Sequence, residues 1–318
     1  MVNNSTRPLI EGAMLTAITV IMAITGTALP MFFFLLYILP IPISINIFRH
    51  GLRWGFISIV VSSLITGSLF GFFPALSVLI TTSFTSPALG IGFRHFSPIK
   101  NLLIATATSI ISVGILLSAS SLIMDINIFS SLEATLTTAT QTSIKMYQAM
   151  GLSPADIQIQ TQQIQNIVKL IMLSLPAGII LFAIFITLIN FLLTHRLLKR
   201  IDATELPGLP PFAEWRMPII FLFLFGFSLV GMYWGSTRHI NLLYNISFNL
   251  NYFSSMFCRV QGLSLLYCGL QHFKLATVPK IMIIILVIFT PFMEIIMYAG
   301  LFDMIFDYRT RFANSKKD

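Results

Sequence analysis

Residues 9–48 read LIEGAMLTAITVIMAITGTALPMFFFLLYILPIPISINIF, and Glu11 is the only charged residue among them. A transmembrane helix needs about 20 mostly apolar residues to cross a hydrocarbon layer about 30 Å thick. The stretch therefore predicts two consecutive membrane-spanning segments, over 9–29 and 30–48. A cleaved signal peptide would not be followed at once by a second apolar run of this kind, so we expect the first segment to stay in the protein.

The rest of the chain has the same character. Of its 318 residues, 9% are charged and 56% are hydrophobic, and the mean hydropathy is +0.88. Soluble domains carry about 25% charged residues, and a soluble protein of this size has no means of hiding so much apolar surface. The composition excludes a soluble enzyme, a disordered chain and a disulfide-stapled secreted domain. It predicts an all-α, polytopic helical bundle in a lipid bilayer, with about eight or nine transmembrane helices.

Further apolar runs and basic turns extend the pattern. The runs after the first two cover 54–70, 72–93, 101–124, 167–193, 217–234, 240–273 and 281–301. We expect three parts: a six-span membrane bundle over 1–200, a cytoplasmic Pro-rich elbow over 201–216, and additional spans with a basic tail over 217–318. Nine simple spans would leave the tail outside, with Arg309, Arg311, Lys316 and Lys317. An inside tail requires that 240–273 folds as two pieces or that the chain turns back at Pro291, and both alternatives stay open.

The net charge of +8 comes from small basic groups between the apolar runs. This distribution is typical of the positive-inside rule and not of a nucleic-acid-binding stripe, so we predict no nucleic-acid partner. With the N-terminus in the cytoplasm, nine basic residues up to Arg216 lie inside, and only Lys145 and Lys169 lie outside. The nine are Arg7, Arg49, Arg53, Arg94, Lys100, Arg196, Lys199, Arg200 and Arg216.

The segment 125–166 is rich in Ser, Thr, Gln and Ala, and this orientation places it outside the cell. Ser153, Pro154 and Asp156 form a typical helix start, with a side-chain cap, a proline in the first turn and an acid near the positive end of the helix. We expect one helix ending near Gly151 and a second that begins at Pro154 and continues into the sixth span. A helical cap over an outer opening and a solvated loop without function are both open.

No sequence pattern for catalysis is present. The chain lacks GxxxxGK[ST], HExxH and GxSxG, and its five histidines lie at the ends of spans. Cys258 and Cys268 are interpreted as packing residues. We therefore predict no catalytic residue, no metal site and no cofactor, and we expect that the protein is not an enzyme.

Polar residues inside apolar runs are the remaining candidates for function. An ionisable group within a span costs about 2.5–3.5 kcal/mol on insertion scales. Arg259 and Glu294 are the deepest pair in the sequence, and with Gln261 they are candidates for a polar cavity. The alternative is that Arg259 reaches an interface and Glu294 lies near a proline-bent helix end. Glu11 and Asn190 are weaker candidates.

Two further features point to cavities or contacts. Pro40 and Pro42 lack a backbone donor and disturb the second span, so they predict either a cavity-lining break or a simple kink. Small residues four apart let helices approach closely in lipid. They occur at Ala13/Ala17, Gly51/Gly55, Gly67/Gly71, Ala88/Gly92 and Gly231/Gly235, and most are expected to serve internal packing.

The first six spans resemble the substrate-binding S components of energy-coupling factor transporters. The resemblance lies in the AxxxA of the first helix, the Pro-rich second segment, and the glycine-punctuated GLRWG, GSLFGFFPA and PALGIG of the next two. It implies that Ala13 and Ala17 dock on a transmembrane coupling subunit, that ATPases act in trans, and that a small molecule binds in a pocket opening to the outer face. The spans after Arg200 have no counterpart in S components.

Over nearly its whole length the chain is similar to the YybS-like family of bacterial membrane proteins, to which no activity is assigned. The matching stretches are EGAMLTA (11–17), RHGLRWG (49–55), LSLPAG (173–178), RLLKR (196–200), QGLSLL (261–266) and GLFDMIFDYRTR (300–311). The resemblance implies a multi-pass protein of the bacterial plasma membrane. Two functions are consistent with these observations: a small-molecule uptake subunit that relies on partners, and a membrane scaffold of the cell envelope without transport activity.

Overall fold

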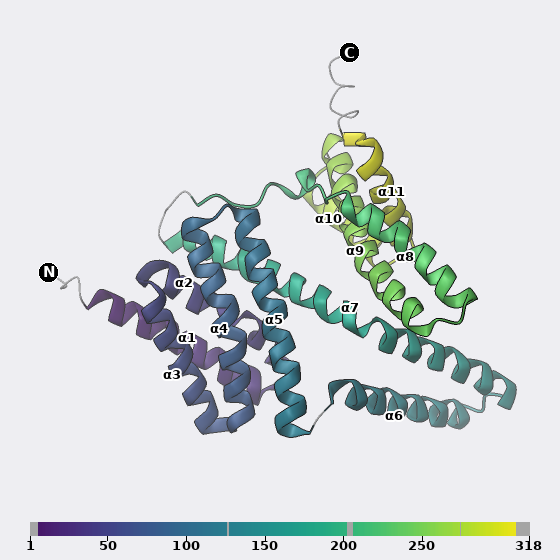
Figure 1. Cartoon of the computed structure of the whole chain (residues 1–318), viewed down its shortest axis with the longest axis horizontal. Helices are drawn as coiled ribbons and strands as arrows, with labels where there is room; N and C mark the ends of the chain where they lie inside the picture. The colour runs from purple at the N-terminus through teal and green to yellow at the C-terminus, as the bar shows by residue number, and fades with distance from the viewer. Residues whose placement is uncertain (1–5, 126, 202–205, 274, 310–318) are drawn as a thin grey trace, which may run out of the picture. The chain divides into compact units, whose positions relative to one another are not determined.

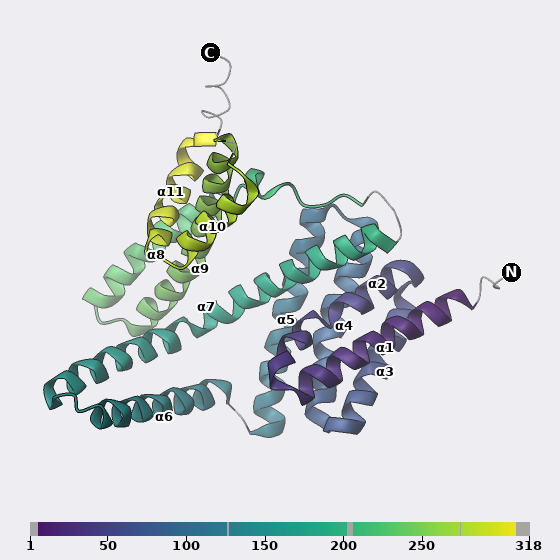
Figure 2. The same ribbon diagram turned by 180° about the vertical axis from the view of Figure 1, so that it is seen from behind.

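The computed structural model describes residues 6–125, 127–201, 206–273 and 275–309, and every regular element in these ranges is a helix. The chain divides into two compact units (Figures 1 and 2). Unit 1 comprises residues 1–162 and 180–209, and unit 2 comprises residues 163–179 and 210–318. The expected all-α polytopic architecture is confirmed. Arg311, Lys316 and Lys317 of the predicted tail and residues 202–205 of the predicted elbow lie outside the described residues.

Unit 1 is built from helices whose bounds follow the apolar runs. They are α1 (Arg7–Ala28), the 3₁₀ helix η1 (Pro30–Ile38), α2 (Pro40–His50), α3 (Leu52–Phe70), α4 (Phe72–His95), α5 (Pro98–Met124), α6 (Ile128–Ala149) and the two ends of α7 (Pro154–Ile201), over 154–162 and 180–201. α3, α4 and α5 lie side by side as successive antiparallel helices (Figure 1).

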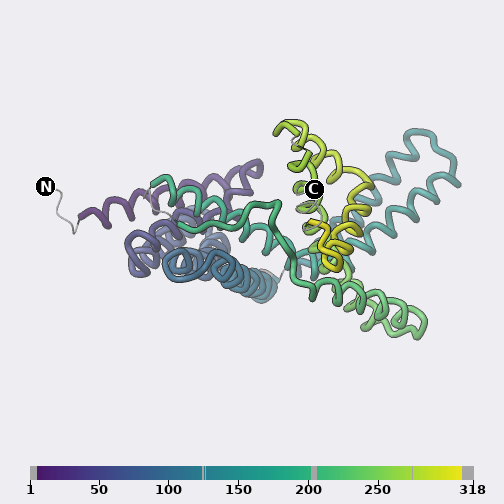
Figure 3. Tube along the Cα trace, turned by 90° about the horizontal axis from the view of Figure 1, so that it is seen from above, coloured from purple at the N-terminus to yellow at the C-terminus, as the bar shows by residue number. Residues whose placement is uncertain are grey.

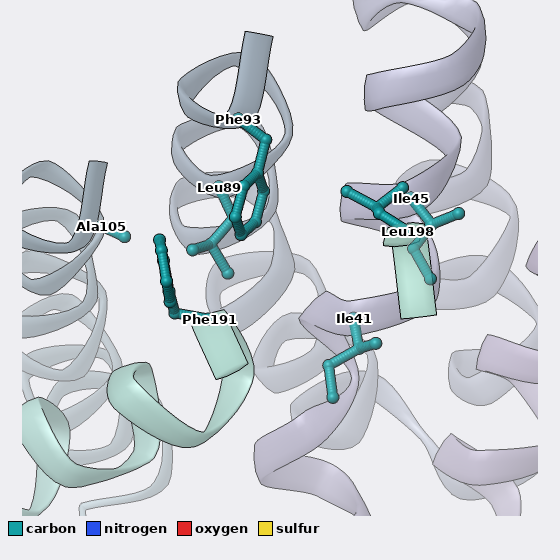
Figure 4. Packing of buried hydrophobic residues seen from close by; sticks show 7 residues of the cluster. All are labelled: Ile41, Ile45, Leu89, Phe93, Ala105, Phe191 and Leu198. Atoms are coloured by element: carbon teal, nitrogen blue, oxygen red, sulfur yellow. The ribbon is translucent and has the colours of Figure 1, made fainter. Parts of the chain in front are cut away.

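The core of unit 1 joins α2, α4, α5 and α7. The rings of Phe93 and Phe191 lie 4.8 Å apart, and both are buried with Leu89 between the helices (Figure 4). Such contacts replace lipid with protein on one side of each helix, while the opposite sides keep large exposed apolar residues such as Leu64 and Leu103. Exposed leucines of this kind are expected where the surrounding solvent is hydrocarbon.

The second span, Pro30–His50, changes from a 3₁₀ helix to an α-helix at Leu39, on the N-terminal side of the two prolines. Pro40 and Pro42 are in the first turn of α2, where backbone N–H groups have no helical partner in any case, and both are buried. The preceding nine residues form η1. Its carbonyl at Tyr37 accepts a hydrogen bond from Asn190 Nδ2 at 3.0 Å, so the bundle supplies a partner to the irregular backbone.

The helix start predicted at Ser153 is confirmed. Ser153 Oγ accepts from the Asp156 backbone N–H at 3.2 Å and lies 2.7 Å from Asp156 Oδ2. The helix that begins there, α7, continues without interruption for 48 residues and includes the sixth span. The preceding helix α6 ends at Ala149, two residues before Gly151.

Unit 2 is organised around one long helix, α9 (Asn241–His272), so the alternative in which 240–273 folds as two pieces is wrong. α9 is antiparallel to α8 (Ile220–Thr237), and Figure 3 shows the two lying side by side up to the turn that joins them. The close approach depends on Gly235, because a Cβ at that position would collide with the backbone of Tyr244.

The chain ends in a bent helix pair, α10 (Thr277–Ile288) and α11 (Phe292–Phe306), whose axes differ by 101° at the break beside Pro291. The bend falls where the second alternative placed the turn of the chain. Within the described ranges, seven helices are long and apolar enough to cross a membrane, or eight if the bent pair is one span. α9 is not among them, because asparagine, serine and glutamine side chains lower its hydropathy.

Candidate functional site

The first candidate site is a groove in unit 1 between α1 and α3. Its volume is about 430 Å³, and small residues of α1 form one wall while Trp54 and Ile57 of α3 lie opposite. Ala13 and Ala17 are exposed and line this groove, and Gly12 lies beside them. The pair predicted from the AxxxA spacing therefore lies on an exposed surface of α1 and is not buried by packing within unit 1.

A chain of polar side chains forms the floor of the groove and joins three helices. Thr16 Oγ1 lies 2.7 Å from Ser58 Oγ, which links α1 to α3. Asn46 of α2 donates from Nδ2 to Ser58 Oγ at 2.8 Å and to the Trp54 carbonyl at 3.2 Å. Side-chain hydrogen bonds between helices stabilise packing in lipid. These hydrogen bonds therefore link the α1 and α3 walls of the groove to each other and to α2.

The helix ends next to this groove meet in a charged cluster around Glu11. Its carboxylate lies 2.8 Å from Arg7 Nε, 2.7 Å from Arg49 Nη1 and 2.9 Å from His50 Nε2. Arg94 then donates to the Arg49 carbonyl at 3.3 Å. The beginning of α1 and the ends of α2 and α4 therefore lie at one end of unit 1, as expected for helices that alternate in direction.

The second candidate site is in unit 2, where the structure separates the residues predicted to share a cavity. Arg259 and Glu294 form an ion pair, with Nη2 and Oε1 2.7 Å apart, and Arg259 Nη1 donates to Ser255 Oγ at 3.0 Å. Gln261 does not join them. Its Nε2 donates to Asp303 Oδ2 at 2.6 Å, and its Oε1 accepts from the Met217 backbone N–H at 2.8 Å.

The position of Arg259 along α9 also differs from its apparent depth in the sequence. The ring of Phe257 stacks on Phe221, at the beginning of α8, with centroids 3.9 Å apart. Arg259 is therefore level with the elbow that precedes α8 and not with the middle of the α8–α9 pair. α9 extends about 48 Å at 1.5 Å per residue, so its second half continues past the length of one bilayer crossing.

A buried ion pair that the sequence reasoning missed lies beside Gln261. Arg309 and Asp303 approach to 3.1 Å, and their side chains are 6% and 1% exposed. Arg309 also donates to the Ala213 carbonyl at 2.6 Å and to the Gln261 carbonyl at 3.3 Å. We name Gln261, Asp303, Arg309 and Ala213 the elbow cluster. Both charged members of the cluster lie in the stretch GLFDMIFDYRTR (300–311). Their contact with the elbow depends on the fold and cannot be inferred from this stretch alone.

The elbow cluster places the end of the bent helix pair beside the elbow. Arg216 and Asp307 form a second, exposed ion pair there at 2.9 Å. The start of α10 is at the same end of unit 2, because Lys280 lies over the ring of Tyr267, which is 5.9 Å from that of Phe212 in the elbow. Both ends of the α10–α11 pair therefore lie on the elbow side of unit 2.

The polar side chains of α9 reach each neighbouring element of unit 2 in turn. Asn249 binds the backbone of α7, Asn251 donates to Ser228 of α8 at 3.0 Å, and Ser264 donates to the Phe212 carbonyl of the elbow. These residues were not identified as candidates, although Asn241, Asn245 and Asn249 recur at the four-residue spacing of one helix face.

The helices and sites together define a polytopic α-helical membrane protein with an open groove in one unit and a network of polar contacts in the other. The model of the family described as "Predicted membrane protein (DUF2232)" matches residues 17–304, and the chain belongs to this family. It is 24% identical over 316 residues to "Uncharacterized protein YybS" of Bacillus subtilis (strain 168), covering 96% of this chain and 98% of that protein. No solved structure matches the chain.

Proposed function

We propose that this protein is a non-catalytic membrane subunit that captures a small molecule and docks, through the α1–α3 groove, on a transmembrane helix of a partner protein. The exposure of Ala13 and Ala17 along a groove with a hydrogen-bonded floor carries the proposal. A helix with its own small residues fits such a surface, because close backbone approach supplies the packing energy that lipid-exposed helices otherwise lack. The chain has no P-loop, so energy for uptake would come from partner ATPases.

The docking part of the proposal predicts the effect of filling the groove. Ala13→Leu together with Ala17→Leu adds two branched side chains to its α1 wall, and we expect loss of the co-purifying membrane partner in mild detergent. Ala107→Leu, on an exposed face of α5, is the matched control and should retain the partner. Intact partner assembly in the double variant, measured by native mass spectrometry, would show that this surface is not the docking face.

The same purification separates uptake from the second candidate function, a membrane scaffold. Retained metabolite or co-purified coupling and ATPase subunits support uptake. A ligand-free protein bound to cell-envelope proteins supports the scaffold and contradicts uptake. One observation favours the scaffold. Among the described residues of helix α6, Thr140 is the one that is buried, so the helix is exposed along nearly its whole length and offers a large surface outside the bundle.

We further propose that the protein lies in the bacterial plasma membrane with its N-terminus, the elbow and the end of α11 in the cytoplasm. The charge bias supports the first two placements, and the contact of Arg309 with Ala213 supports the third. This orientation requires α9 to cross the membrane beside α8 although its polar side chains lower its hydropathy, and α10 and α11 then form a re-entrant hairpin that enters and leaves the membrane on the cytoplasmic side. Contacts of α11 with Phe225 and Cys258, near the elbow end of the α8–α9 pair, agree with a hairpin that does not cross.

Single cysteines test this orientation in a chain from which Cys258 and Cys268 have been removed. A membrane-impermeant maleimide added to intact cells should label a cysteine at Ala149 in α6, and should label cysteines at Pro207 and Phe306 only after the cells are opened. Labelling at Phe306 in intact cells would mean that the hairpin crosses the membrane, and labelling at Pro207 would reverse the whole orientation.

A further inference from the structure

The helix α7 contains a proline where it passes between the two units. Residues 163–179 of α7 belong to unit 2 and residues 180–209 to unit 1, and Pro176 precedes this boundary by one helical turn. Pro176 has no N–H, so the carbonyl of Met172 loses its usual helical donor. Gly178 follows closely and has open space where a side chain would be. The sequence LSLPAG is thus a weak point in a 48-residue helix.

The side chain of Asn249 binds α7 at this point. Its Oδ1 accepts from the Ala177 backbone N–H at 3.1 Å, and its Nδ2 donates to the Leu173 carbonyl at 2.9 Å. In a regular helix, the N–H of residue 177 pairs with the carbonyl of residue 173. The amide of Asn249 therefore presents to this turn the same acceptor and donor that a peptide group would present.

The amide is also held in place by its own helix. Asn249 Nδ2 donates a second hydrogen bond, at 2.9 Å, to the Asn245 carbonyl one turn earlier in α9. Both amide hydrogens and the oxygen are thus engaged, and their assignment is fixed because each partner accepts only or donates only. A side chain that is required only for packing would not need three directed hydrogen bonds.

We propose that Leu173–Gly178 is a hinge in α7 and that Asn249 is the clasp that couples this hinge to α9. In hydrocarbon an unpaired backbone N–H or carbonyl is costly, so α7 bends here only as far as Asn249 keeps its contacts. α9 bears both the clasp and Gln261 of the elbow cluster, so a displacement at the elbow is transmitted along a rigid helix to α7. The device rests on contacts inside unit 2 and in α7, and is independent of docking at the α1–α3 groove.

The test uses the full chain in lipid nanodiscs and the variant Asn249→Leu, which keeps the side-chain size but removes the three hydrogen bonds. We expect amide hydrogen exchange in the peptide that contains Ala177 and Gly178 to become about tenfold faster, since one net hydrogen bond shifts an opening equilibrium by roughly that factor. Spin labels at Ile167 and Phe185, both exposed on α7, should report a broader distance distribution.

Asn245→Leu is the matched control, because its side chain is exposed and only its backbone contacts the clasp. Exchange and distances in this control should equal those of the unmodified chain. An Asn249→Leu protein that also equals the unmodified chain in both measurements overturns the clasp.

Pro176→Ala tests the hinge separately. It returns a backbone N–H to α7, so Pro176→Ala alone should slow exchange around Ala177, and combined with Asn249→Leu it should restore the narrow distance distribution. Unchanged exchange in the single proline variant contradicts the hinge, and this outcome can be read even if Asn249→Leu does not fold.

Discussion

Replacing Arg309 with methionine should destabilise the protein far more than breaking the neighbouring exposed ion pair. The variant removes the guanidinium from Asp303 and leaves a carboxylate that is 1% exposed without its counter-charge. It also deprives the Ala213 carbonyl of a 2.6 Å hydrogen bond. Removing one partner of a buried ion pair costs about 3–5 kcal/mol. The lower value corresponds to a factor of roughly 150 in the unfolding equilibrium constant.

Arg216→Gln is the matched control, since it breaks an ion pair between the same two segments. The side chains of Arg216 and Asp307 are 57% and 40% exposed, and solvent-exposed pairs contribute about 0–1 kcal/mol. Both variants are compared in mixed micelles, with helicity followed by circular dichroism as the fraction of denaturing detergent rises. The two midpoints should therefore differ clearly.

A double-mutant cycle completes the test of the elbow cluster. Asp303→Leu with Arg309→Met removes both charges, so no unpaired charge is left buried, and the loss should be smaller than the sum of the two single losses by about 2 kcal/mol or more. The reasoning is refuted if Arg309→Met costs no more than Arg216→Gln, or if the single losses add without any coupling term.

Two further changes test local packing and capping. Gly262→Ala places a Cβ against the Ile296 carbonyl of α11 and should lower the free energy of unfolding by about 1–3 kcal/mol in the same assay. Gly269→Ala, on the same helix with open space around it, should leave the stability unchanged or raise it, and equal stabilities of the two variants would contradict the tight α9–α11 crossing. Ser153→Ala removes the cap of α7 and should cost about 1 kcal/mol, with faster amide exchange at Asp156 as its local signature, and unchanged exchange there would argue against the cap.

The positions and lengths of most helices were predictable because the thickness of the bilayer dictates the length of an apolar run. The bounds of α3 and α4 differ from the predicted runs by at most a few residues, and the start of α7 follows from local capping at Ser153. The bend near Pro291 was one of two alternatives. Charge counting alone did not choose between them, and the other alternative is excluded because α9 is one continuous helix.

The depth and partners of the polar residues were not predictable in the same way. Arg259 was assigned to the middle of an apolar run, but α9 is longer than one crossing, so its position in the run does not measure its depth. Gln261 and Arg259 are two residues apart on α9, so their side chains leave the helix on different sides and contact different residues, Asp303 and Glu294. The three-dimensional packing is needed to identify these partners. Asn249 gave no signal beyond its spacing, since its role depends on a proline 73 residues earlier in the chain.

Site-specific photocrosslinking from Ala17 in living cells tests the proposed docking role most directly. A photoreactive amino acid at this position faces the α1–α3 groove, and one at Leu103, which is 64% exposed on α5, serves as the lipid-facing control. We predict a discrete adduct from position 17 whose crosslinked peptide, identified by mass spectrometry, lies in a small-residue transmembrane helix of another protein, and lipid adducts alone from position 103. Lipid adducts alone from position 17 would contradict a docked partner helix.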